Sequence, residues 1–259
     1  MIIVLSPSKT LDFITKTSVE YTNPEFLNET FELILALRKL TKTDISRLMS
    51  ISENLAFLNY VRYAHFSITP TLDASRPAIY AFKGDVYNGL AIDHYNDKDI
   101  QYAQNHLRII SGLYGLLRPL DLIQPYRLEM GVKLANHKGK NLYEYWKDIV
   151  TIKLNALLQS TNDNILVNLA STEYFKAINI KLLQSKLITP VFKEKKGDKE
   201  KIVALFAKRA RGMMASYIIK NRINTVEGLK EFKQDGYRFD GLTSLKDQIV
   251  FIREAIKED

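Results

Sequence analysis

Short apolar segments alternate along this chain with longer stretches of helical periodicity, and this alternation limits the fold more than any other feature. Residues 2–5 predict a buried strand that ends at a Ser-Pro-Ser break. Further Ile-, Leu- and Val-rich segments predict strands over 78–82, 165–169, 187–192, 202–206 and 248–252. Helices are predicted from Asn23 and from Ser52, and over 99–110 and 141–159. Residues 195–198 contain a glycine suited to a hairpin turn.

The length and composition favour a single folding unit. A chain of 259 residues that is 46% hydrophobic can bury a sizeable core, and it contains no internal repeat or Pro/Ser linker. We therefore expect one α+β domain over residues 1–259, with a mixed sheet and helices.

Several classes of protein are excluded or disfavoured by residue usage. The chain has no cysteine, which rules out disulfides, a thiolate nucleophile and a cluster held by its own cysteines. The histidines at 65, 94, 106 and 137 lack a recognisable ligand spacing, so we expect no metal site and no cofactor. The start lacks a signal-peptide pattern and no segment is apolar enough to span a bilayer, so we expect a cytoplasmic protein without a membrane partner.

Positive charge is concentrated in one part of the chain. Residues 193–222 hold ten Lys and Arg against three Asp and Glu, a net charge of +7 out of +8 for the whole protein. Lys208, Arg209 and Arg211 open a segment of helical character, and arginine forks suit phosphate oxygens. A solvated basic face is the alternative, but Met213, Met214 and Ile218 indicate that part of this helix is buried.

Residues 109–117 form the most informative local pattern, an apolar segment followed by Gly112 and Gly115 and more apolar residues. The pattern is similar to the hairpin of a helix-hairpin-helix motif, where glycines let backbone N–H groups approach a phosphate. The alternative is a helix C-cap and tight turn between packed helices. Arg108, Arg118 and Arg127 near the pattern favour the first interpretation.

The signals for catalysis are weak. Lys83 and Asp85 lie close together in the sequence, as do Arg127 and Glu129, and each carboxylate could act as an acid or base or form a structural ion pair. Ser6 and Lys9 match an S-x-x-K pattern, but its companion motif is absent and we treat the match as accidental.

Six motif blocks stand out along the chain, namely SPSKTLD at 6–12, FKGDVY at 82–87, SGLYGLLRPLD at 111–121, PYRLEMG at 125–131, NLASTEYF at 168–175 and AKRARG at 207–212. These blocks resemble the signature blocks of the YaaA family of bacterial peroxide stress proteins. They occur in the family's order, and the resemblance covers residues 1–240, whereas 241–259 follow the family less closely.

The resemblance implies a cytoplasmic protein of unusual α+β fold that binds DNA, including distorted or branched forms. It implies a helix-hairpin-helix element beside a basic cleft, a role in the response to hydrogen peroxide, and an association with low intracellular free iron. Carried over by position, the hairpin comprises Ser111, Gly112, Tyr114 and Gly115. The cleft draws on Lys9, Lys83, Arg118, Arg127, Lys208, Arg209 and Arg211.

Three hypotheses follow for the function. The first is DNA binding through phosphates, with DNA as the only partner expected. The second is an enzyme acting on a nucleic acid or a nucleotide in the same cleft, with Asp85, Glu129 or Glu173 acting on a base or sugar. The third, direct iron sequestration, has little support because the chain has no cysteine and no clustered histidine.

Overall fold

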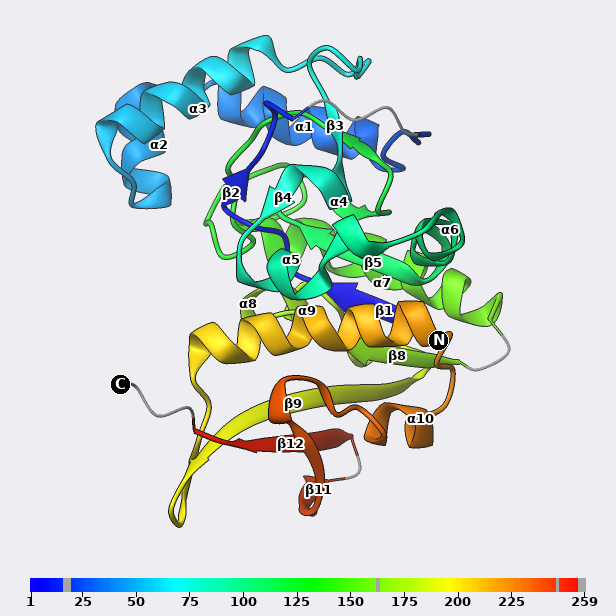
Figure 1. The fold of residues 1–259 in the computed structure, drawn as a ribbon. Coiled ribbons are helices and arrows are strands. Elements are labelled where there is room, and N and C mark those ends of the chain that lie inside the picture. Colours follow the sequence, from blue (N-terminus) through cyan, green and yellow to red (C-terminus); the bar gives the residue numbers. More distant parts are fainter. Residues whose placement is uncertain (16–19, 162–163, 246, 256–259) are drawn as a thin grey trace.

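The computed structural model describes residues 1–15, 20–161, 164–245 and 247–255, and its centre is a mostly parallel sheet (Figure 1). The sheet has eight strands, with the order β11-β12-β9-β8-β1-β5-β6 and with β10 paired to β9. Its strands are β1 (Ile2–Leu5), β5 (Leu107–Ser111), β6 (Gly115–Leu117), β8 (Ile165–Asn168), β9 (Lys186–Lys196), β10 (Lys199–Lys201), β11 (Arg238–Leu245) and β12 (Gln248–Glu254). The strands β5, β1, β8, β9 and β12 run parallel to one another.

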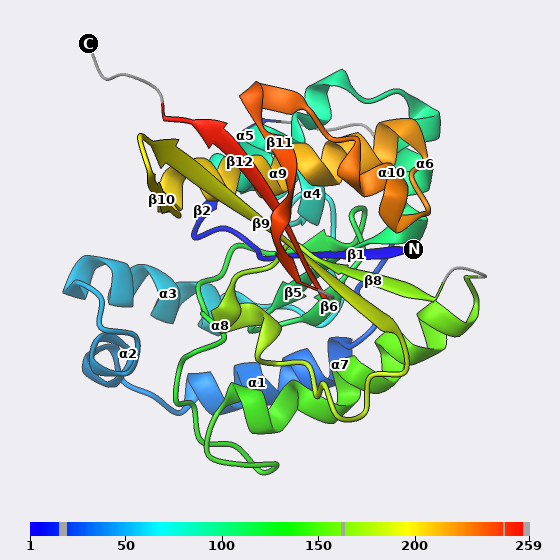
Figure 2. The same cartoon turned by 90° about the horizontal axis from the view of Figure 1, so that it is seen from below.

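Helices cover both faces of the sheet. The α-helices are α1 (Leu27–Arg38), α2 (Lys42–Met49), α3 (Glu53–His65), α4 (Ala78–Ala81), α5 (Asp85–Leu90), α6 (Asp97–His106), α7 (Leu142–Gln159), α8 (Thr172–Phe175), α9 (Ala204–Asn221) and α10 (Val226–Lys230). Figure 2 shows α1 and α7 on one face and α5, α6 and α9 on the other, with α2 and α3 at one side. The mixed sheet with helices that the sequence predicts is confirmed.

Two short antiparallel pairs lie outside the main sheet. β2 (Thr10–Leu11) pairs with β4 (Phe82–Lys83), and β3 (Arg76–Pro77) pairs with β7 (Leu122–Ile123). The first pair places Thr10 opposite Lys83, so it joins two motif blocks that are far apart in the chain.

Local side-chain chemistry explains several helix starts. Thr41 and Asp44 form a reciprocal capping box at α2, and Asn141 accepts a hydrogen bond from Glu144 N at the start of α7. Ser52 caps α3 as predicted. Asn23 does not cap a helix, because α1 begins at Leu27.

Two strand predictions are wrong, and one helix prediction is right only in part. Residues 78–82 are mainly the helix α4, and 202–206 contain the start of α9. The helix predicted over 99–110 ends at His106, where the chain continues directly as β5. All five residues of β5 are buried, so this central strand lacks the polar alternation that marks a half-exposed strand, and a short apolar run alone fits either structure.

Candidate functional site

The loops after β1, β5 and β8 meet at one edge of the sheet because these strands are parallel. Ser171 N donates a hydrogen bond of 2.9 Å to Ser6 Oγ, which joins the loop after β8 to the loop after β1. Tyr87 OH, from α5, donates to Ser6 O at 3.1 Å. Ligand sites in sheets of this kind often lie outside the carboxyl ends of the strands.

Glu129 belongs to a small charged cluster beside these loops. Its Oε1 is 3.2 Å from Lys9 Nζ and accepts hydrogen bonds from the Arg127 guanidinium. Its Oε2 is buried and has no hydrogen-bond partner among the described residues. Tyr63, on α3, donates its hydroxyl proton to the carbonyl oxygen of Arg127 and so fixes this segment against α3. The structure therefore brings Lys9, from the block at 6–12, together with Arg127 and Glu129, from the block at 125–131.

An open hollow of about 590 Å3 lies beside Glu129. Its charged lining consists of three cations and two carboxylates, namely Lys9, Arg47, Lys133, Glu129 and Glu173. Glu173 Oε1 accepts a hydrogen bond of 3.0 Å from Gly131 N, so this carboxylate is engaged in holding the loop after Glu129. Arg47 and Lys133, which also line this hollow, belong to none of the motif blocks in the sequence.

Lys83 and Asp85 lie on either side of a glycine with positive φ. Lys83 Nζ is 3.8 Å from Asp12 Oδ2, and Asp85 is the first residue of α5. Gly84 has φ of 108°, and a Cβ there would be 3.3 Å from Ser8 Oγ. The glycine therefore allows the turn that connects Lys83 to α5 close to the loop after β1.

The segment predicted as a helix-hairpin-helix element is a tight turn between β5 and β6, and this corrects the prediction. Ser111, Gly112, Tyr114 and Gly115 are all buried. The amides of Leu113 and Tyr114 donate to Ser111 Oγ, at 3.2 and 3.0 Å, rather than facing solvent.

Packing explains both glycines in this turn. A Cβ on Gly112 would lie 2.2 Å from the carbonyl oxygen of Leu128, and Gly115 has φ of 68° with the Trp146 ring against it. The glycine spacing therefore reflects close approach within the core rather than a phosphate cradle. Arg118, which follows β6, is also bound within the fold, because its guanidinium pairs with Asp121 and donates to Asn23 O.

Most of the excess positive charge gathers at the β9–β10 hairpin and the first half of α9, which are close neighbours in the chain. Within the described part of the chain, no ion pair forms with any of seven cations there, which we call the basic patch: Lys195, Lys196, Lys199, Lys201, Lys208, Arg209 and Arg211. Lys208 and Arg209 are exposed. Arg211 is half-buried, and burial lowers the pKa of its guanidinium. The four hairpin lysines belong to the charged run in the sequence but were not predicted as site residues.

Helix α9 packs unusually closely on α5. A Cβ on Gly212 would lie 1.8 Å from Val86 O, and one on Gly89 would lie 2.1 Å from Arg209 O. This contact couples the position of the basic patch to that of α5, which begins at Asp85. The expectation that part of the basic helix is buried is confirmed, since Met214 and Ile218 are inaccessible.

The described residues contain neither a grouped metal-ligand set nor a membrane-spanning helix. Within residues 1–15, 20–161, 164–245 and 247–255, no three His, Asp or Glu side chains are grouped so that they could hold a metal ion. Over the same ranges, no helix has both the length and the apolar composition needed to cross a bilayer.

Comparison with known proteins decides the family. The family described as peroxide stress protein YaaA matches residues 1–242. The chain belongs to the YaaA family. Two relatives, each named a UPF0246 protein, come from Aliivibrio fischeri strains ES114 and MJ11. Each is 50% identical over 255 residues, covering 98% of this chain and 98% of the relative. The resemblance found in the six motif blocks therefore extends over nearly the whole chain. The family is described as one of peroxide stress proteins.

Proposed function

We propose that this protein binds DNA through phosphate contacts made by the basic patch. The observation that carries the proposal is that seven cations lie on adjoining elements without ion pairs among the described residues. Unpaired lysines and arginines attract the phosphate backbone, and release of condensed counterions drives such binding. The contacts read the backbone and not the bases, which suits a protein that recognises DNA shape.

The start of α9 supports the same interpretation. The residue before the helix is Val203, which provides no side-chain cap for the first-turn amides. The helix is 18 residues long, so the positive end of its dipole adds to the charge of Lys208 and Arg209.

Other cations predicted from the sequence take a smaller part in the proposal. Lys9 and Arg127 share Glu129, Lys83 lies near Asp12, and Arg118 is held by Asp121. A cation that already has a carboxylate partner gives up that interaction to bind phosphate, so its net contribution is reduced. The buried hairpin residues Ser111, Gly112, Tyr114 and Gly115 are left out of the proposed interface.

Fluorescence anisotropy across a salt series tests the proposal, with labelled duplex, single-stranded and four-way-junction DNA. The variant Lys208→Ala/Arg209→Ala/Arg211→Ala should bind more weakly than the unaltered protein. Its logarithmic salt slope on duplex DNA should flatten by about 0.9 for each phosphate that the variant no longer neutralises.

A matched triple variant controls for net charge. Lys147→Ala/Lys181→Ala/Lys186→Ala removes the same formal charge from exposed lysines on α7, the turn after α8 and the start of β9. It should leave both affinity and slope close to those of the unaltered protein. Equal weakening by the two triple variants, or a flat salt dependence of the unaltered protein, contradicts the proposal.

A second candidate function is an enzyme acting on a nucleic acid or nucleotide at Glu129. The buried Oε2, which lacks a partner among the described residues, favours it, because it leaves a carboxylate beside the hollow with an unsatisfied acceptor for a proton. Glu173 lines the same hollow but already holds Gly131 N, and Asp85 at the start of α5 is the third carboxylate of this hypothesis. Glu129→Gln separates the two functions: loss of peroxide resistance with DNA affinity intact supports the enzyme, and parallel loss of both contradicts it.

The proposed DNA binding acts in the cytoplasmic response to hydrogen peroxide, in association with low free iron. Membership of the family described as peroxide stress protein YaaA supports this context. Cells lacking the gene, complemented with the unaltered protein or with the α9 triple variant, test the link by electron paramagnetic resonance of chelated iron. If the triple variant keeps free iron low under peroxide, DNA binding is not the route to that effect.

A further inference from the structure

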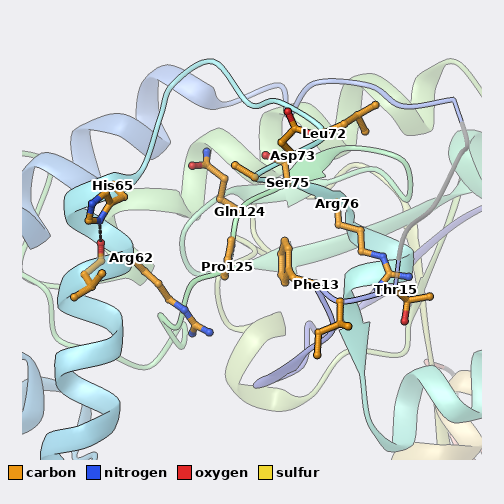
Figure 3. A pocket seen from close by; sticks show the side chains of 13 residues that line it. Phe13, Thr15, Arg62, His65, Leu72, Asp73, Ser75, Arg76, Gln124 and Pro125 are labelled. Atoms are coloured by element: carbon orange, nitrogen blue, oxygen red, sulfur yellow. Dashed lines mark hydrogen bonds between the residues drawn. The ribbon is translucent and has the colours of Figure 1, made fainter.

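A separate cavity of about 660 Å3 lies between the end of α3 and the segment that follows β2 (Figure 3). Its volume falls within the range that holds small organic ligands. Phe13, Pro125 and Leu72 provide apolar surface, while Arg62, Ser75 and Arg76 provide polar groups. The motif blocks supply only Pro125 among these six residues, and neither the basic patch nor the Glu129 cluster includes any of them.

Phe13 lies within a turn that the Asp12 side chain holds together. Asp12 Oδ1 accepts hydrogen bonds from the amides of Ile14 and Thr15, at 2.9 and 3.1 Å, and Asp12 Oδ2 is 2.8 Å from Arg76 NH1. Figure 3 shows Phe13 beside Pro125 within the cavity. The aromatic ring is therefore fixed as one wall of the cavity. Nucleic-acid bases stack well on an aromatic ring.

Arg62 provides the anion-binding group. Its side chain is half-buried, and the only hydrogen bond of the guanidinium among the described residues is a 3.5 Å contact from NH1 to Asn59 Oδ1. No carboxylate in the described part of the chain forms an ion pair with it, and burial lowers the pKa of its guanidinium. Figure 3 shows the side chain extending from α3 toward Pro125. A guanidinium without a partner in a cavity suits one phosphate, which it can bind through two oxygens.

Two buried polar atoms in the lining also lack partners. Ser75 Oγ and Arg76 Nε have no hydrogen bond within the described residues, although Ser75 and Arg76 are each only 6% exposed. Buried polar groups are nearly always satisfied, so such atoms indicate a missing ligand or water. Ser75 and Arg76 line the cavity on the side opposite α3 (Figure 3).

We propose that this cavity binds one nucleotide unit, with the base against Phe13 and the phosphate on Arg62. Asp73 also lines the cavity, and its negative charge disfavours a second or third phosphate. The nucleotide unit comes from one of two sources, a free mononucleotide or an unpaired nucleotide of a DNA strand. Both sources present the same base, sugar and phosphate to the cavity. The strand form rests on the proposed DNA binding, whereas the free form does not.

Isothermal titration calorimetry with dAMP, dGMP, dCMP and TMP tests the free form, with deoxyadenosine and inorganic phosphate alone as partial ligands. Anisotropy of duplex DNA with and without one extrahelical 2-aminopurine nucleotide tests the strand form. Phe13→Leu removes the aromatic ring and keeps an apolar side chain, and Arg62→Met removes the guanidinium and keeps the stem. Arg238→Met, an exposed arginine of β11 without an ion pair among the described residues, is the matched control.

We expect saturable binding of mononucleotides, or a preference for the extrahelical DNA, that each cavity variant weakens by about tenfold or more and that Arg238→Met leaves unchanged. Arg62→Lys should restore part of the binding, and thermal melting of each variant verifies folding. Binding of free mononucleotides assigns the free form, and a preference for extrahelical DNA alone assigns the strand form. The absence of both, or binding that neither cavity variant weakens, overturns the inference.

The two proposals fail separately. The α9 triple variant should lose duplex affinity while retaining mononucleotide binding, because the basic patch and the cavity share no residues. Loss of the extrahelical preference in Phe13→Leu, with duplex affinity intact, identifies the cavity and leaves DNA binding by the patch standing.

Discussion

The indole Nε1 of Trp146 donates a hydrogen bond of 2.9 Å to the carbonyl oxygen of Gly112. The bond joins α7 to the turn between β5 and β6, so the motif with two glycines is a packing junction between a helix layer and the sheet. The same indole ring would be 2.6 Å from a Cβ on Gly115. Both glycines are therefore fixed by the core.

Gly112→Ala should lower the free energy of unfolding by about 2 kcal/mol or more, because the new Cβ overlaps the backbone oxygen of Leu128. Urea denaturation followed by Trp146 fluorescence measures the change. Gly241→Ala is the control, since its Cβ would meet only Phe239 at an ordinary 3.6 Å. Similar losses of stability in both variants would show that the turn has room for a side chain.

Asp12 should make the stability depend on pH in the acid range. Burial raises the pKa of Asp12, but hydrogen bonds from Arg76, Thr15 and Ile14 outweigh that effect and hold the pKa well below the usual 3.8. Because the folded-state pKa is depressed, the contribution of the carboxylate is complete above the unfolded-state pKa and disappears as the pH falls through the folded-state value.

The comparison with Asp12→Asn isolates this contribution. The unaltered protein should be more stable than the variant by a constant amount above about pH 5, and the difference should shrink progressively below about pH 4. Urea unfolding of both proteins across this range measures it. A difference that does not change with pH would contradict the assignment to the carboxylate charge.

Glu194 and Arg253 form a buried ion pair between β9 and β12, with 2.6 Å between Oε1 and Nε. Their side chains are only 2% and 3% exposed, so Glu194→Leu leaves the Arg253 guanidinium with the more exposed Asp235 as its remaining carboxylate partner and takes the acceptor from Tyr237 OH. We expect this variant to lose about 3 kcal/mol or more. Adding Arg253→Met should recover much of the loss, as measured by a double-mutant cycle from urea unfolding. In the more exposed Lys193 and Glu200 pair, Glu200→Ala should cost about 1 kcal/mol or less.

Elements with strong local signals could be predicted from the sequence. β1, β8 and β12 are apolar runs, and Ser52 and Asn141 each stand one residue before a helix that the sequence predicts. Residues 78–82 could not be assigned locally, because a short apolar run fits a strand or a helix turn equally well. The two-glycine pattern led to a wrong prediction for a related reason. A glycine indicates that another group packs closely against the backbone, but it does not indicate whether that group is a phosphate or part of the core.

Three charged residues of the site at Glu129 could be predicted from the sequence, but the way in which they pair could not. Lys9 comes from the block at 6–12, which follows β1, whereas Arg127 and Glu129 come from the block at 125–131, which follows β7, and no local signal in either block predicts that the two meet. Tyr63 carries no signal in the sequence, because its role is one hydrogen bond to a backbone carbonyl far along the chain. The charged run contains all seven cations of the basic patch, but only the three on α9 were predicted as site residues; the hairpin and α9 are consecutive in the chain, and α9 contacts β9.

Gly212→Ala tests whether the position of α9 controls DNA binding. The added Cβ would lie 1.8 Å from Val86 O, so α9 must move away from α5, and we expect a loss of about 2 kcal/mol or more of stability. DNA affinity should also fall in the folded variant at low temperature, because Arg209 and Arg211 move with the helix. Ala204→Gly, at the exposed first residue of α9, lowers helix propensity by about 1 kcal/mol without touching α5. Anisotropy with duplex DNA should show weaker binding for Gly212→Ala than for Ala204→Gly. Equal DNA affinities of the two variants would mean that phosphate binding by the basic patch does not depend on how α9 packs against α5.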